Sequence, residues 1–462
     1  MFGLLVTNKP NFVKLDFKLS PVEVFYRNCE SCEYAYILES VEGPERLAEY
    51  SFVGFDPCLV VVVKNGLVEV QDRVNGCKNT YRTHDPLSLI KSLVGERYEV
   101  LPSRFIGGAV GYISYDAIRY WERLPEKAFD DFKFPDIELA IYNDGLLFDH
   151  RKGESYYYYY GVNRIHMIEK LVKTETQHEP LSFSDLKTNI KKKRFEDIVA
   201  RSKEYIASGD VFQVVLSRRF EFNFEGGLIS FYKALRRINP SPYMYFLKMG
   251  NRQIVGSSPE MLVRVEGGVV ETFPIAGTRP RVPNDPAKDS ALAEELVKDP
   301  KECAEHAMLV DLARNDIGKV CEYGSVHVSE FMKVYKYSHV QHMVSRVVGR
   351  LRRGLSCYDA LKAVFPAGTV TGAPKIRAME IIEELEPVRR GPYAGAVGYF
   401  SFNGNADFAI AIRTLVASEK RAYIQAGAGV VADSTPEREW LETEYKASAL
   451  LKALQIASEG KA

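Results

Sequence analysis

Two segments that read as helices carry pairs of glutamates whose spacing suits a divalent cation. Glu302 and Glu305 are three residues apart, and so are Glu439 and Glu442. Side chains three apart lie on one face of a helix. Magnesium prefers a few carboxylates together with waters and an anionic substrate. The two pairs predict a magnesium site if the helices face each other across a cleft, whereas solvated helix surfaces would show the same spacing.

Both glutamate pairs follow helix-start signals. Asp299 precedes Pro300, as expected of an N-cap and a first helical residue, and Ser434–Glu437 has the pattern of a capping box around Pro436. The two helices are therefore predicted to begin just before the carboxylates.

Three segments rich in glycine, proline and hydroxyl side chains could present backbone N–H groups to an anion. They are the turn Pro274–Pro280, the loop Phe365–Lys375 and the strand-to-turn segment Gln425–Val431. Small residues leave backbone donors open to a carboxylate or a phosphate. Each segment alone is equally typical of an ordinary turn or loop.

The last of these segments also has the spacing of a dinucleotide-binding fingerprint, Gly427-x-Gly429-x-x-Ala432. That fingerprint requires a following helix, a second strand and an acidic residue about 20 positions later. The residues after Gly429 read as one helix that begins near Pro436. We therefore reject NAD binding.

His342 stands in a stretch rich in valine and methionine. Histidine is the side chain that most readily exchanges protons at neutral pH. A lone histidine is more often a packed or surface residue, so the residue type alone leaves its role open.

The elements that must position these residues alternate between strands and helices. The N-terminal part, to about residue 173, is rich in strand-like runs such as Cys58–Val63 and the five tyrosines Tyr156–Tyr160. A polar stretch, 174–189, is the best linker candidate. A helix that closes at Gly209 and a strand over Val211–Phe222 follow. The pattern predicts an α+β or α/β fold with much sheet.

The charge balance and the cysteines exclude several functional classes. The 61 Lys and Arg residues balance 61 Asp and Glu residues, so the basic face of a general nucleic-acid binder is not expected. No apolar run is long enough to span a bilayer, and Met1–Val6 lacks the features of a signal peptide. Seven scattered cysteines, an odd number, fit a reducing compartment. We expect a cytoplasmic protein with no nucleic-acid or membrane partner.

Taken together, several runs of sequence resemble the chorismate-utilising enzymes, most closely the large subunits of anthranilate synthases. Each run is short, but their shared order makes the match specific. The runs are Gly209–Arg218, Ser258–Glu260, Pro274–Arg281, Glu305–Asp316, His342–Ser345, Pro366–Lys375, Gly398-Tyr399, Ala411–Thr414 and Gln425–Asp433. The resemblance implies an α+β fold in which antiparallel sheets pack as an α/β sandwich with outer helices.

The resemblance also assigns roles to the candidate residues. It implies that Glu305 and Glu442 hold Mg²⁺, with Glu302 and Glu439 nearby. The metal would clamp one carboxylate of chorismate, and the other would meet Arg413, whose guanidinium suits a carboxylate. Further substrate contacts are implied for Gly277, Thr278, Thr369, Tyr399, Gly427, Ala428, Gly429 and Lys446.

The implied reaction adds ammonia at C2 of the ring as the 4-hydroxyl leaves, and then eliminates pyruvate to give anthranilate. A hydroxyl must be protonated to leave, and Glu260 is the candidate acid. His342 is the candidate for assisting the elimination. The resemblance places this reaction at the first step of tryptophan biosynthesis and implies a glutamine amidotransferase partner subunit that supplies the ammonia.

Two positions favour ammonia as the incoming nucleophile. Relatives that make aminodeoxychorismate usually carry a nucleophilic lysine where this chain has Ala276, and relatives that add water carry a lysine base where it has Gln213. A methyl group offers no nucleophile, and a neutral amide cannot deprotonate water. Aminodeoxychorismate synthase component I is the nearest alternative, and a non-catalytic anion-binding module is the alternative from another class.

The N-terminal region resembles the family's feedback site for L-tryptophan. Ala48-Glu49 departs from the Gly-Arg that often precedes the matching Tyr-Ser pair, which leaves the affinity open. We expect residues 1–173 to contribute this site and residues 190–462 to form the chorismate-binding catalytic region. The resemblance implies tryptophan contacts from Glu39, Ser40, Ser51, Pro242, Tyr243 and Met244.

Overall fold

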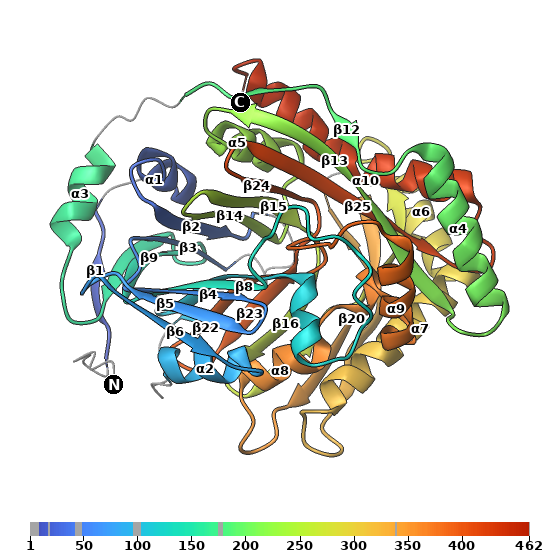
Figure 1. Cartoon of the computed structure of the whole chain (residues 1–462), viewed down its shortest axis with the longest axis horizontal. Helices are drawn as coiled ribbons and strands as arrows, with labels where there is room; N and C mark the ends of the chain where they lie inside the picture. The colour runs from blue at the N-terminus through green and yellow to red at the C-terminus, as the bar shows by residue number, and fades with distance from the viewer. Residues whose placement is uncertain are drawn as a thin grey trace.

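The computed structural model describes residues 9–16, 19–41, 49–95, 103–173, 179–337 and 340–461. Within these residues two large sheets form, and their neighbouring strands pair antiparallel. In Figure 1 the helices α1, α5 and α10 lie above the first sheet, and α2 and α8 lie below the second. The predicted α+β sandwich with outer helices is confirmed.

The first sheet contains 13 strands among the described residues. The short strands β12 (Lys187–Thr188) and β21 (Gly372–Ala373) pair with its strand β13. The remaining strands follow in spatial order: β1 (Asn11–Lys14), β10 (Glu154–Tyr159), β9 (Asp144–Asp149), β3 (Tyr50–Phe55), β2 (Tyr34–Glu39), β14 (Tyr243–Met249), β15 (Arg252–Ser258), β24 (Thr414–Ser418), β25 (Arg421–Val430), β13 (Gln213–Glu225) and β11 (Ser182–Phe183).

The second sheet contains 12 strands in the same described ranges. Strand β19 (His327–Lys336) pairs with its strand β20. The others follow in spatial order: β18 (Ile275–Pro280), β20 (Val340–Arg350), β17 (Val269–Thr272), β16 (Met261–Glu266), β23 (Ala406–Ile410), β22 (Ala396–Ser401), β7 (Gly108–Ile113), β8 (Ile137–Tyr142), β4 (Leu59–Lys64), β5 (Leu67–Asp72) and β6 (Cys77–Arg82). Because β2 pairs with β14 and β7 pairs with β22, the N-terminal and C-terminal regions share both sheets.

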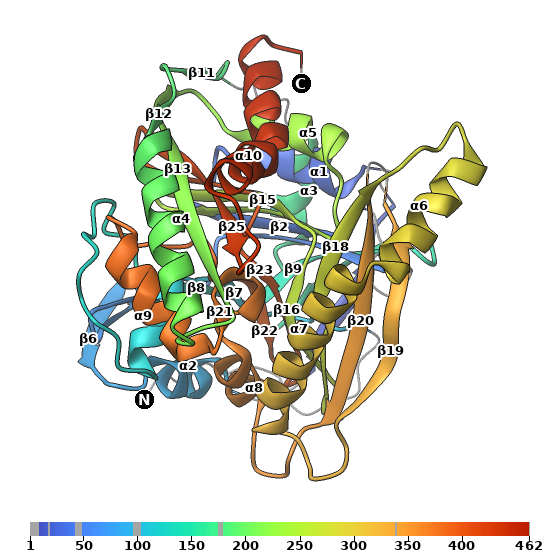
Figure 2. The same ribbon diagram turned by 90° about the vertical axis from the view of Figure 1, so that its right-hand side faces the viewer.

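The helices pack mostly on the outer faces of the sheets. Figure 2 shows α6 and α7 along β18 and β20, and α4 beside α10. No helix in the described part of the chain is long and apolar enough to cross a membrane. The helices are α1 (Pro21–Asn28), α2 (Pro86–Val94), α3 (Ile165–Lys173), α4 (Lys192–Ala207), α5 (Ile229–Ile238), α6 (Pro286–Lys298), α7 (Pro300–Gly318), α8 (Cys357–Val364), α9 (Lys375–Leu385) and α10 (Pro436–Ser458), with the 3₁₀ helices η1 (Tyr115–Tyr120) and η2 (Gly368–Val370).

The core has a layer between the sheets and a layer on each outer face. Between the sheets, the rings of Tyr36 on β2 and Tyr142 on β8 meet edge to face at 4.7 Å between centroids. Outside the first sheet, Leu235 of α5 and Leu450 of α10 belong to one buried cluster with strand residues. Such burial of apolar surface on three layers is the main source of stability for a sandwich of this kind.

Several local predictions are confirmed. Strand β10 contains four of the five consecutive tyrosines. The predicted helix is α4, and Gly209 beyond its end has a φ of +83°. The carboxylate of Asp299 accepts the backbone N–H groups of Lys301 and Glu302 at the start of α7. Of the polar stretch 174–189, residues 174–178 lie outside the described residues, and the remainder contains β11 and β12.

Three local predictions are wrong. Ile275–Pro280 is the strand β18 rather than a turn, because a bulge near Gly277 maintains its pairing with β20. The predicted strand does not turn at Gln425 but continues to Val430, because β13 pairs with it that far. Thr435 forms no side-chain capping bond at the start of α10.

Candidate active site

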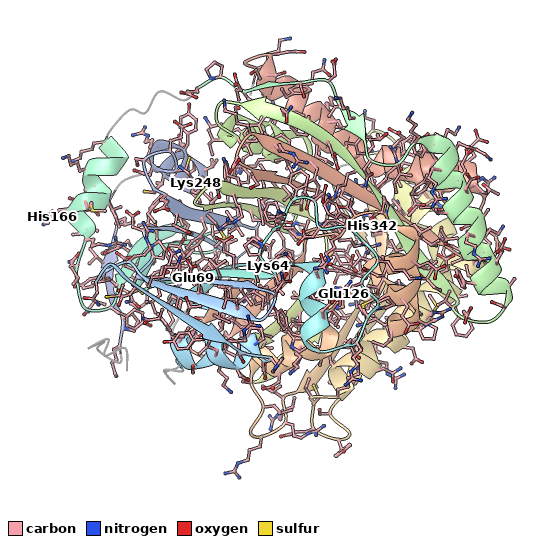
Figure 3. All side chains as sticks on the ribbon, viewed as in Figure 1. Lys64, Glu69, Glu126, His166, Lys248 and His342 are labelled. Carbon is pink, nitrogen blue, oxygen red and sulfur yellow. The ribbon has the colours of Figure 1, made fainter. Side chains whose placement is uncertain are left out.

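A cavity of about 320 Å³ lies where β13, β18, β20, β25, α7, α10 and η2 meet. Figure 3 labels His342 on the same side of the view as β13 and β25, far from His166 on α3. Most of the candidate residues line this cavity, although they come from distant parts of the chain. They are Glu260, Gly277, Thr278, Glu305, His342, Thr369, Arg413, Gly427, Gly429, Glu442 and Lys446.

Two residues predicted to contact the substrate do not line this cavity. Tyr399 on β22 lines a different cavity, whereas Tyr393, which precedes β22, lies near Arg413 in the first. Ala428 is fully buried between Gly427 and Gly429. Successive strand residues point to opposite faces, so its methyl group points away from the cavity that the two glycines line.

The carboxylates of Glu305 on α7 and Glu442 on α10 reach the cavity from two helices. Burial raises the pKa of Glu305, and the carboxylates of Glu302 and Glu442 raise it further, although Lys301 opposes the shift. Burial also raises the pKa of Glu439, whose Oε2 has no hydrogen-bond partner among the described residues. Partly buried carboxylates that repel one another are a suitable environment for a divalent cation.

Two of these carboxylates form ion pairs with basic side chains. Lys446 Nζ lies 2.6 Å from Glu442 Oε1, and Arg279 Nη1 lies 3.1 Å from Glu302 Oε1. Across the described ranges, no three carboxylate, histidine or cysteine side chains converge into a complete metal site. Because magnesium retains waters and takes substrate oxygens as ligands, Glu305 and Glu442 fit an ion whose shell those oxygens complete.

Glu260 follows β15 and is buried, with 7% of its surface exposed. Burial raises its pKa to about 8, against the opposing influence of the Thr369 hydroxyl and the Lys446 ammonium. A carboxyl group with such a pKa is protonated at neutral pH and can donate its proton. The geometry therefore suits the predicted acid.

His342 on β20 is oriented by its Nδ1 atom. Nδ1 lies 3.1 Å from the carbonyl oxygen of Gly277 and 3.0 Å from Oγ1 of Thr278. A hydrogen bond to the carbonyl places the proton on Nδ1, which leaves Nε2 as an acceptor. Burial lowers the pKa of His342, and Arg413 lowers it further, against the opposing influence of the Gly277 carbonyl. A neutral imidazole with an unprotonated Nε2 can accept a proton from a substrate.

Arg413 has a φ of +51°, in the left-handed region that arginine rarely adopts. Such strain costs about 1–3 kcal/mol and concentrates at functional sites. Its Nη1 donates to the carbonyl oxygen of Lys446 at 2.7 Å. Lys446 Nζ in turn donates to the carbonyl oxygen of Gly427 at 2.9 Å. Two cations therefore face the cavity, which suits a substrate with more than one carboxylate.

At three glycines that line the cavity, an added Cβ would collide with a neighbouring side chain. A Cβ on Gly277, whose φ is +74°, would lie 2.9 Å from Glu302 Oε2. A Cβ on Gly429 would lie 2.7 Å from Gln213 Nε2, and one on Gly427 would lie 2.7 Å from the hydroxyl oxygen of Tyr393. Gly277 is favoured by its positive φ and Gly427 by the nearby Leu216 carbonyl oxygen at 3.0 Å, whereas a side chain at position 429 would displace the end of Gln213.

The sequence predicted that a turn at Gln425–Val431 would present open backbone N–H groups. In the structure this segment belongs to β25, and one edge of the strand lacks a partner there among the described residues. Strand β24 pairs with β25 only as far as Ile424, whereas β13 continues to Val430. The other edge of Gln425–Val430 pairs with no further strand in the described part of the chain. Gln425, Gly427 and Gly429 line the cavity along this edge.

Sequence reasoning missed Tyr393 and Gln425 as cavity residues. The signal for Tyr393 was the Gly391-Pro392 turn that immediately precedes it, where Gly391 has a φ of +59°. Gln425 lies on a strand that is buried over nearly its whole length, so its sequence context carries no such signal.

A second, smaller cavity of about 50 Å³ is lined by residues of β2, β3 and β14 in the first sheet and of β22 in the second. Ser51 does not line it, because its Oγ faces His150 Nε2 at 2.7 Å on the opposite side of β3. Ala48 lies outside the described residues. The lining includes the predicted Glu39, Ser40, Pro242, Tyr243 and Met244, together with Tyr50, Arg104, Arg264, Tyr399 and Asp407.

Both signs of charge are held at this second cavity. Glu39 accepts the Tyr232 hydroxyl at 2.7 Å, and Arg236 Nε donates to it at 3.1 Å. Arg104 Nη2 lies 2.6 Å from Glu49 Oε2. Glu49, the residue that departs from the family pattern, is therefore the buried ion-pair partner of an arginine that lines the cavity. A cavity with fixed charges of both signs suits a zwitterion.

A third cavity, of about 320 Å³, lies between the other two. It shares His342 and Arg413 with the first and Pro242 with the second. Asn239 Nδ2 donates to Ser257 Oγ at 2.7 Å, and the Ser257 N–H donates to the carbonyl oxygen of Arg413 at 3.0 Å. The segment Asn239–Pro242 thus contacts the surroundings of both sites.

Comparison with known proteins agrees with this geometry. The family described as chorismate binding enzyme matches residues 33–452. The chain is 48% identical over 459 residues to anthranilate synthase component 1 of Methanothermobacter marburgensis, covering 99% of this chain and 98% of that protein.

Two solved structures have the same overall fold. Anthranilate synthase component I from Streptococcus pneumoniae superimposes with a TM-score of 0.77 at 39% identity, covering 89% of this chain and 93% of that one. The menaquinone-specific isochorismate synthase from Escherichia coli superimposes with a TM-score of 0.73 at 19% identity, covering 97% of this chain and 94% of that one, and supports the fold alone. The chain therefore belongs to the chorismate-binding enzyme family and, within it, to the anthranilate synthase component 1 group.

Proposed function

We propose that this chain is a carbon–oxygen lyase that converts chorismate and ammonia to anthranilate and pyruvate, with Mg²⁺, at the first step of tryptophan biosynthesis. The observation that carries the proposal is the set of side chains that line one cavity. A buried acid, Glu260, and a neutral histidine, His342, line it together with Arg413 and two carboxylates from different helices.

In the first step a C–N bond forms at C2 and the C4–O bond breaks. The Glu260 proton passes to the departing hydroxyl, which leaves as water, and Glu260 becomes a carboxylate. Its raised pKa keeps it protonated at neutral pH before this step. The ammonium group formed at C2 then releases one proton, which returns Glu260 to its acid form. In the second step Nε2 of His342 accepts the C2 proton as the bond between ring C3 and the enolpyruvyl oxygen breaks. The departing enolate then gains a proton on carbon to become pyruvate.

The substrate's carboxylates are matched by two kinds of partner. Arg413 offers a fork of N–H donors to one of them. A magnesium ion on Glu305 and Glu442 would bind the other and polarise it. The repulsion among Glu305, Glu302 and Glu442 supports a cation at this position.

Ammonia is the proposed nucleophile because two positions lack the lysine that the other reactions would require, namely position 213 for activating water and position 276 for forming a covalent intermediate. Gln213 and Ala276 line the cavity at these positions instead. We propose that a glutamine amidotransferase subunit delivers the ammonia in the cell, as the designation component 1 of its relatives suggests. We also propose a cytoplasmic location, which the seven free cysteines support.

We further propose that L-tryptophan inhibits the enzyme by binding at the second cavity. Glu39 and Arg104 provide charges for its ammonium and carboxylate groups. The cavity encloses about 50 Å³, so an indole ring requires lining side chains to move. The contact of Asn239–Pro242 with the surroundings of Arg413 supports communication between the two sites.

The test is to mix the purified chain with chorismate, Mg²⁺ and an ammonium salt at mildly alkaline pH, with and without tryptophan. We expect fluorescent anthranilate that depends on Mg²⁺ and decreases with tryptophan. Consumption of chorismate without anthranilate would instead indicate aminodeoxychorismate or isochorismate as the product. No consumption at all would indicate a binding module.

A further inference from the structure

Arg390 is buried behind the cavity, with 1% of its surface exposed. It forms a two-pronged ion pair with Glu386 at the end of α9. Its Nε donates to Oε2 of Glu386 at 2.9 Å, and its Nη2 donates to Oε1 at 2.6 Å. Neither residue lines the cavity, so the reaction scheme above leaves both without a role.

The remaining hydrogen bonds of Arg390 end on two walls of the cavity. Nη1 donates to the carbonyl oxygen of Val370 at 2.7 Å, and Nη2 donates to that of Val215 at 2.7 Å. Val370 follows Thr369, which lies beside the acid Glu260, and Val215 is two residues from Gln213. One guanidinium therefore fixes η2 and β13 relative to each other.

Glu386 extends the same network to a third wall. Its Oε1 accepts the backbone N–H of Ser217 at 2.7 Å and the Ser217 hydroxyl at 2.9 Å. Gln425 Nε2 donates to Ser217 Oγ at 2.8 Å. Gln425 lines the cavity on β25, so the carboxylate of Glu386 helps to set the position of this strand's edge.

The main chain of Arg390 leads directly to a fourth wall. The Tyr423 hydroxyl donates to its carbonyl oxygen at 3.2 Å, and Asp116 accepts the N–H of Gly391 at 2.8 Å. Tyr393 follows in the same turn and lines the cavity. The guanidinium of Arg390 also lies 5.7 Å from the centre of the Tyr393 ring.

We propose that Arg390 and Glu386 are positioning residues, which set the relative placement of Gln213, Thr369, Tyr393 and Gln425 around the substrate. This inference rests on the proposed function. A buried ion pair is a poor source of stability because of the desolvation it requires. The hydrogen bonds of this pair reach the segments that carry the cavity residues. Its contribution is therefore to hold these segments in fixed positions relative to one another. Loosening the pair lowers the stability of the fold, because it leaves a buried charge unpaired, and it also changes the alignment of the substrate with ammonia.

The test compares Arg390→Lys and Glu386→Gln with a matched pair elsewhere in the protein. Arg252 and Glu138 form a similar two-pronged ion pair, with distances of 2.7 and 2.6 Å, and line none of the three cavities described above. The controls are therefore Arg252→Lys and Glu138→Gln. The measurements are the thermal midpoint, kcat, the KM for chorismate, and the ratio of anthranilate to the products of water addition.

Lysine keeps the charge of Arg390 but cannot reach two carbonyl groups and a carboxylate in one plane. We expect Arg390→Lys to lower kcat about 10- to 100-fold, the effect of a displacement near 1 Å. The product ratio should shift towards water addition, and Glu386→Gln should show the same shift to a smaller extent. The control variants should change the thermal midpoint by a similar amount and leave kcat and the product ratio within about twofold.

Two outcomes would overturn the inference. In one, Arg390→Lys and Glu386→Gln keep the wild-type kcat and product ratio. In the other, the losses follow the folded fraction equally in all four variants. If the wild-type chain itself forms no anthranilate, the proposed function fails instead. Should Arg390→Lys not fold, Glu386→Gln alone decides between the outcomes.

Discussion

The hydroxyl group of Tyr393 occupies the space beside Gly427 where any other residue would place its Cβ. An added Cβ would lie 2.7 Å from the hydroxyl oxygen, well inside van der Waals contact. Gly427 also provides the carbonyl oxygen that accepts Lys446 Nζ. The position of a cavity tyrosine and that of a cavity lysine thus depend on one glycine.

The first prediction concerns this contact. Gly427→Ala should lower kcat/KM for chorismate about 10- to 100-fold, because Tyr393 must move by an appreciable fraction of an ångström. Gly318→Ala is the control, because nothing lies within 4 Å of the Cβ it adds. Steady-state kinetics and thermal midpoints of both variants check the prediction. Equal kcat/KM values for the two would show that Tyr393 does not require its present position.

The second prediction concerns the metal. Glu305→Gln and Glu442→Gln should each abolish the activation of turnover by Mg²⁺, because an amide is a weaker ligand for a hard cation than a carboxylate. Binding of Mn²⁺, followed by electron paramagnetic resonance, should weaken in parallel. Glu437→Gln is the control on α10, because the Glu437 side chain is 73% exposed. Near-normal Mg²⁺-dependent activity in either cavity variant would contradict the assignment.

Local sequence signals predicted where helices begin better than they predicted which way the side chains of a strand point. The helix α7 followed from Asp299 and Pro300 because a capping carboxylate and a proline act within one turn of helix. The resemblance placed Tyr399 at the substrate site, whereas this residue lines the second cavity, and β22 is buried over its whole length. With both faces buried, a strand lacks the alternation of apolar and polar residues that would indicate which side chains face a site.

The burial of both strand faces also explains why the sequence could not show that Ala428 and Ser51 point away from the cavities. Ala428 lies on β25 and Ser51 on β3, and both strands are buried on both faces. The interleaving of the N-terminal strands with both sheets was also beyond local reasoning, since the pairing of β2 with β14 joins residues about 200 positions apart. The family resemblance named the candidate residues, and only the fold showed which of them line one cavity.

The third prediction concerns pH. Because Glu260 must be protonated to act, kcat should fall as the pH rises through its pKa of about 8. Glu260→Gln should lower kcat about 100- to 10,000-fold and remove this limb of the pH profile. A wild-type profile that is flat from pH 6.5 to pH 9.5, at a constant concentration of unprotonated ammonia, would exclude Glu260 as the acid.

Stability provides an independent measure of the same pKa. The folded-state pKa of Glu260 lies above that of an unfolded glutamate, about 4.3, so the unfolded chain loses this proton first as the pH rises. The contribution of Glu260 to stability is therefore complete below about pH 4 and decreases up to about pH 8. Glu260→Gln should gain stability relative to wild type over that range, by up to about 1.4 kcal/mol per pH unit. Denaturant titrations at several pH values check this, and a constant difference would mean that the pKa is not raised.

The last prediction concerns inhibition by tryptophan. It compares two residues that were predicted to contact the inhibitor, of which only one lines the second cavity. Glu39 lines the second cavity, whereas Ser51 faces His150 on the opposite side of β3. Glu39→Gln should weaken inhibition about tenfold or more, because it removes a charged partner of the ligand's ammonium group. Ser51→Ala should leave inhibition within about twofold. Calorimetric titration with tryptophan and inhibition curves at fixed chorismate test both variants. If Ser51→Ala abolished inhibition while Glu39→Gln retained it, the inhibitor would have to bind on the His150 side of β3.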